Sequence, residues 1–75
     1  MDKELQQYYE ERFSTFSTKG WKQLLEDVRI MRDNYALIST INNLEELHYR
    51  KGQLDILEWL LSIEAISKTA YDDLL

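Results

Sequence analysis

Apolar residues recur at alternating intervals of three and four in the second quarter of the chain. The positions are Trp21, Leu24, Val28, Met31, Tyr35 and Ile38. This spacing is typical of a coiled-coil seam, in which one stripe of a helix packs against a partner helix. Ser17 or Thr18 can accept a hydrogen bond from a free amide of the first turn. The pattern therefore predicts a helix over residues 19–39 as the central element of the fold.

A second long helix is predicted over residues 44–63. Asn43 is followed three positions later by Glu46, which is the spacing of a capping box, and the short connection before it favours an antiparallel hairpin with the first long helix. Gly52 lies inside this helix and can mark either a kink or the close approach of another backbone. We favour a continuous helix, because Leu47, Leu54, Leu57 and Leu61 stay in phase across the glycine.

Two short helices are predicted to flank this hairpin. Residues 2–16 carry an apolar stripe rich in aromatic side chains, and residues 68–74 follow a connector over residues 62–67. The predicted fold class is all-α: an antiparallel helical hairpin with short flanking N- and C-terminal helices, assembled into a bundle as one helical domain.

The second half of the long C-terminal helix is apolar around most of its circumference. A helix of this kind is normally buried on several sides, and one hairpin partner covers only one of them. We therefore expect a homo-oligomer, a dimer or higher, or a complex with another protein; the alternative is that the flanking helices close a monomeric core. The predicted interface residues are Tyr49, Ile56, Trp59, Leu60 and Ile63, together with Tyr8, Tyr9 and Phe13 of the first helix.

Composition narrows the range of functions. The chain has 75 residues, no cysteine and a net charge of −5, so disulfides cannot stabilise so small a core and self-association is the usual substitute. An acidic protein is poorly suited to nucleic acid or to anionic membranes. The charged N-terminus is unlike a signal peptide, and no apolar run is long enough to span a bilayer. We expect a protein that is not secreted.

The strongest enzyme-like motif is the Glu-x-x-His pair of Glu45 and His48. This spacing occurs in di-iron carboxylate bundles, which also need an inward glutamate from a neighbouring helix. Glu26 is the one glutamate of the central helix and falls on its outer side. The preferred interpretation is a capping acid and a surface histidine, so no metal, cofactor or enzymatic activity is expected.

The C-terminal half carries an aromatic-basic-x-Gly-Gln-Leu-Asp pattern followed by Trp-Leu-Leu. Here these are Tyr49, Arg50, Gly52 to Asp55, and Trp59 to Leu61, with a Tyr-acidic-x-Leu ending at residues 71–74. The segment resembles the C-terminal half of small helical proteins of tailed bacteriophages. The resemblance implies a viral accessory or virion-associated protein, in the host cytoplasm or the particle, and it brings no catalytic residues.

Three functions therefore remain open. The first is a non-enzymatic phage structural or protein-interaction module that self-associates through the C-terminal long helix. The alternative is a small acidic inhibitor or adaptor that binds one host protein, since an acidic surface complements a basic site. The third is a di-metal carboxylate four-helix bundle.

Overall fold

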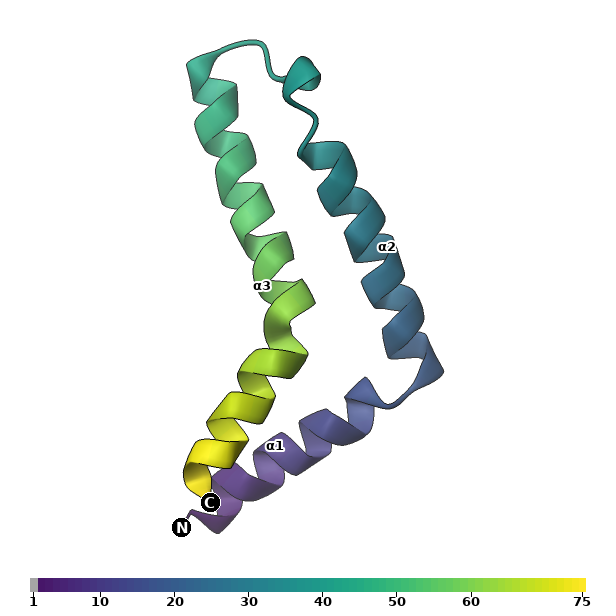
Figure 1. Ribbon diagram of the computed structural model, residues 1–75, viewed down its shortest axis with the longest axis vertical. Coiled ribbons are helices and arrows are strands. Elements are labelled where there is room, and N and C mark those ends of the chain that lie inside the picture. Colours follow the sequence, from purple (N-terminus) through teal and green to yellow (C-terminus); the bar gives the residue numbers. More distant parts are fainter. Residues whose placement is uncertain (1) are drawn as a thin grey trace.

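The computed structural model describes residues 2–75 and contains three α-helices and one short 3-10 turn (Figure 1). Helix α1 spans Lys3–Phe16, α2 spans Lys19–Tyr35 and α3 spans Leu44–Leu74, with the 3-10 turn η1 at Ile38–Thr40. Within these residues there is no β-strand, so the all-α prediction is confirmed. None of these helices combines the length and the apolar composition needed to cross a bilayer.

Each helix begins at a side chain that accepts hydrogen bonds from its first turn. Asp2 accepts from the amides of Glu4 and Leu5, and Thr18 accepts from Trp21. Asn43 accepts from Glu46 at 2.8 Å, while the Glu46 carboxylate accepts from the Asn42 amide at 2.9 Å. The predicted capping box is therefore present, although its return bond goes to the amide one residue before the cap.

Helices α2 and α3 pack antiparallel, and two hydrogen bonds fix their register. The indole of Trp21 donates to Glu64 at the start of α2, and Arg50 donates to the carbonyl of Tyr35 at its end. Trp21 and Tyr35 are 14 positions apart on α2, and Arg50 and Glu64 are 14 positions apart on α3. Both separations are about four helical turns. The two helices are therefore aligned over the whole length of α2, as Figure 1 shows.

Helix α1 lies across the other half of α3. Its start lies beside the end of α3, far from the turn between α2 and α3 (Figure 1). Phe13 packs edge-on against Tyr71 at 5.3 Å between ring centroids, and Phe16 lies 5.1 Å from Trp21. Within residues 2–75, the N-terminal half of α3 thus contacts α2 and the turn that follows it, whereas its C-terminal half also carries α1.

The two long helices differ in length from the prediction. Helix α2 ends at Tyr35 rather than at residue 39, because Leu37 is extended and Ile38–Thr40 form a separate 3-10 turn. Helix α3 continues to Leu74, so the connector at 62–67 and a separate helix at 68–74 are wrong. Ser67 suggested a loop, but it is fully buried and accepts a 3.1 Å bond from Arg12 where α1 crosses α3.

The stripe of α2 that faces α3 is also rotated from the predicted seam. Leu25 and Val28 are the buried residues of α2, whereas Leu24 and Met31 are about half exposed. A shift of one position turns a side chain by about 100° around a helix. Leu25 is not one of the predicted seam positions, and it is buried because α3 approaches from that side.

The resulting core is small for the length of the chain. Among residues 2–75, the buried apolar side chains are Leu25, Val28 and Ile63. The Cα radius of gyration is 16.1 Å, compared with about 11 Å for a compact domain of this size. The helices pack against one another, but the molecule is extended and leaves much apolar surface in contact with solvent.

Candidate interaction surface

One stripe of α3 is exposed in its first half and buried in its second half. Positions 45, 49, 52, 56, 59 and 63 follow one another at intervals of four and three, which is the spacing of a helix–helix seam. Tyr49 is 73% exposed, Ile56 is 67% exposed and Trp59 is 52% exposed, whereas Ile63 is only 9% exposed. We call Glu45, Tyr49, Gly52, Ile56 and Trp59 the open seam.

Helix α1 covers the continuation of this stripe toward the end of α3. Ile63 and Ser67 are buried beneath it, and Arg12 donates to Ser67. Of the predicted interface residues, Tyr9, Phe13 and Leu60 are half-buried within the chain and Ile63 belongs to its core. Tyr8 remains about half exposed at the border between α1 and the open seam.

Gly52 has no packing partner within the described chain. A β-carbon placed on it would meet no atom within 4 Å, and its φ angle is not positive. Neither a turn nor a neighbouring helix of this chain therefore requires glycine at this position. Glycine inside a helix costs about 1 kcal/mol relative to alanine, and no packing contact within residues 2–75 offsets that cost. Since glycine has no side chain, Gly52 leaves a notch in the open seam between Tyr49 and Ile56.

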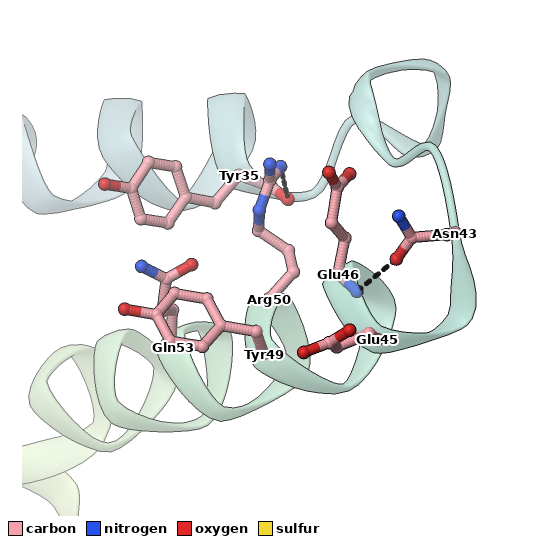
Figure 2. A pocket seen from close by; sticks show the side chains of 7 residues that line it. All are labelled: Tyr35, Asn43, Glu45, Glu46, Tyr49, Arg50 and Gln53. Carbon is pink, nitrogen blue, oxygen red and sulfur yellow. Dashed lines mark hydrogen bonds between the residues drawn. The ribbon is translucent and has the colours of Figure 1, made fainter.

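The end of the open seam nearest the turn borders a hollow of about 570 Å³ between α2 and α3. Figure 2 shows Tyr35 of α2 across from Tyr49 and Gln53 of α3, with Arg50 beside them reaching from α3 to the end of α2. Arg50 donates 3.0 Å bonds to the carbonyl of Tyr35 and to the hydroxyl of Thr40. The guanidinium thus satisfies a carbonyl at the C-terminus of α2 and holds the turn against α3.

The other end of the open seam is formed by α1. A hollow of about 410 Å³ lies there, and its lining includes Tyr8, Arg12, Trp59 and Ile63. The Arg12 guanidinium lies 4.6 Å from the Tyr8 ring and donates to the hydroxyl of that residue. In the part of the chain that the structure describes, Arg12 forms no ion pair, so its charge is balanced only by neutral acceptors and aromatic rings.

Glu45 and His48, the metal-ligand candidates, are both exposed on the first two turns of α3. Over residues 2–75, no group of three or more potential ligand side chains converges. Glu26, the further ligand that a di-iron site would need, lies 3.3 Å from Arg29 on the solvent side of α2. Glu45 itself forms no hydrogen bond or ion pair within this range and lies beside Tyr49 on α3, as Figure 2 shows.

Two contacts between α3 and α2 could not be found from the sequence pattern. The roles of Arg50 and Glu64 depend on how α2 and α3 align, and periodicity alone does not determine that register. The positive charge seven residues into α3 was the available clue to Arg50, because helix C-termini favour nearby cations.

No family model, curated protein or solved structure matched this chain.

Proposed function

We propose that this chain is a non-enzymatic helical interaction module that self-associates through α3. The observation that carries the proposal is the change in exposure along a single stripe. Ile63 is buried under α1, while Tyr49 and Ile56, on the same side of α3, are about two-thirds exposed or more. When one half of an apolar stripe is covered and the other half is exposed, the exposed half is a candidate surface for packing against another chain.

The small core supports the same conclusion. Three buried apolar side chains within residues 2–75 are few for a domain without disulfides, and small chains commonly gain the missing burial by association. The resemblance of the C-terminal half to small phage proteins supports a structural or accessory role in a viral particle or in the infected host cell.

Static light scattering over a range of protein concentrations tests the proposal. We expect the wild-type chain to shift from monomer toward a fixed oligomer at micromolar concentration. Ile56→Asp should remain monomeric with unchanged helix content, because it places a charge in the open seam without touching the core. Ser62→Asp adds the same charge to an exposed position of α3 outside the seam and should associate like the wild type.

A small acidic adaptor that binds one host protein is the alternative. The net charge of −5 and the exposed aromatic side chains Tyr49 and Trp59 favour it, since aromatic residues are common at binding hot spots. A wild-type chain that stays monomeric at every concentration would overturn self-association and favour the adaptor.

A further inference from the structure

We infer that the occupant of the open seam is the α3 helix of a second copy, lying antiparallel, with Ile56 of each copy seated over Gly52 of the other. This inference rests on the proposed function and specifies its geometry. It makes the interface isologous, so that each contact occurs twice about a twofold axis.

The covered half of the stripe shows which kind of element fits it. There the occupant is a helix, α1, which places Arg12 and Phe13 against Ser67 and Tyr71. The open seam has the same spacing of three and four residues and continues the covered stripe without interruption. A second helix laid along it would therefore extend an arrangement that the chain already uses.

The ends of the open seam define the register. At one end α3 begins at Leu44, and at the other α1 closes over Ile63. A twofold axis midway between these ends passes near residue 54. It places Gly52 opposite Ile56 of the second copy and Tyr49 opposite Trp59. The Gly52 layer then pairs a residue without a side chain with a bulky one, and the Tyr49 layer pairs two aromatic side chains.

The second observation is the identity of residue 52, a glycine in the interior of α3. The monomer does not account for a glycine at this position, because the space around its missing side chain is empty. In the inferred dimer that space receives Ile56 of the second copy and lets the two backbones approach closely. Gly52 then has a packing partner in the dimer, which it does not have within residues 2–75 of a single copy.

Charge complementarity supports the same register. Arg12 lies beside Ile63 at one end of the open seam, and Glu45 lies at the other; within residues 2–75 neither forms an ion pair. The twofold axis brings position 45 of one copy level with position 63 of the other, at the edge of α1 where Arg12 lies. Each Arg12 therefore meets Glu45 of the second copy, and the two pairs close both ends of the interface.

The first experiment compares Gly52→Leu with Gly20→Leu by sedimentation equilibrium. Both glycines are exposed helical positions with open space around them, but only Gly52 lies in the seam. We expect Gly52→Leu to weaken dimerisation at least about tenfold, which corresponds to about 1.4 kcal/mol, and Gly20→Leu to leave it unchanged. Equal dimerisation of Gly52→Leu and the wild type would overturn the notch while leaving self-association intact.

The second experiment exchanges the charges of the inferred pair. Arg12→Glu and Glu45→Arg each place like charges together at both ends of a homodimer, so each variant alone should dimerise several-fold more weakly. A mixture of the two should form heterodimers in preference to either homodimer in native mass spectrometry, because both ends then carry opposite charges. A statistical mixture would overturn the antiparallel register, whereas a wild type that never dimerises would overturn the proposed function itself.

Discussion

Trp21 and Glu64 are joined by a 2.7 Å hydrogen bond from the indole Nε1–H to the carboxylate, although they are 43 positions apart. The Trp21 ring also lies 5.1 Å from that of Phe16, the last residue of α1. One side chain of α2 thus contacts both other helices at the point where they meet. This junction determines how far along α3 the hairpin pairing extends.

The hydrogen bond between Trp21 and Glu64 should contribute to stability at this junction. Trp21→Phe keeps an aromatic ring against Phe16 but removes the donor, and we expect it to lower the free energy of unfolding by about 1 kcal/mol. Glu64→Gln should lose less, because its amide oxygen still accepts. Urea denaturation of both single variants and the double variant measures the coupling; additive losses would contradict a direct interaction.

The N-cap of α3 gives a prediction with a matched neighbouring control. Asn43→Ala removes the acceptor for the Glu46 amide and should destabilise the chain by about 1 kcal/mol. Asn42→Ala changes an adjacent asparagine whose contribution is its backbone amide, so its stability should change little. Thermal unfolding followed by circular dichroism compares the two, and equal losses would mean that the cap is not the cause.

The crossing of α1 over α3 should not tolerate a larger residue at position 67. Ser67 is fully buried, and Ser67→Leu should cost about 2 kcal/mol by overpacking. Ser62→Leu introduces the same side chain at an exposed position of the same helix and should be nearly neutral. Chemical denaturation measures both; a Ser67→Leu variant as stable as the wild type would show that α1 does not pack on α3 at this point.

Leu57 and Ile56 are neighbours in sequence but face different surroundings. Leu57 is half-buried and lies seven positions from both Arg50 and Glu64, the residues that bond to α2, while Ile56 is 67% exposed. Leu57→Asp places a carboxylate at the helix pairing and should lower stability by roughly 3 kcal/mol or more, which should unfold so small a chain. Circular dichroism of dilute protein checks this; retained helicity in Leu57→Asp would contradict the observed face of α3.

The local signals for helix starts predicted the structure well, because capping depends on residues close in sequence. Thr18 and Asn43 begin α2 and α3 as expected, and Asp2 begins α1. Features that depend on contacts between helices were predicted less well. Ser67 indicated a loop from composition, but its small size is what lets α1 and α3 approach closely.

Which side chains of α3 are exposed could be predicted only in part, for the same reason. The apolar excess of α3 was visible in the sequence, and Tyr49, Ile56 and Trp59 are exposed in the structure, which leaves their predicted place in an interface untested. Periodicity could not separate them from Ile63, which lies on the same stripe, because only the position of α1 divides the stripe into a covered and an open half. The roles of Gly52 and Arg12 depend on that division.

Where α2 pairs with the N-terminal half of α3, no third helix within residues 2–75 lies over the pair. Apolar side chains there can leave water only when another molecule supplies the missing layer. Association then contributes to the same free energy that holds the helices together. For the dimer that we infer, the melting temperature therefore depends on how much protein is present, and the chain gains its full rigidity only as a pair.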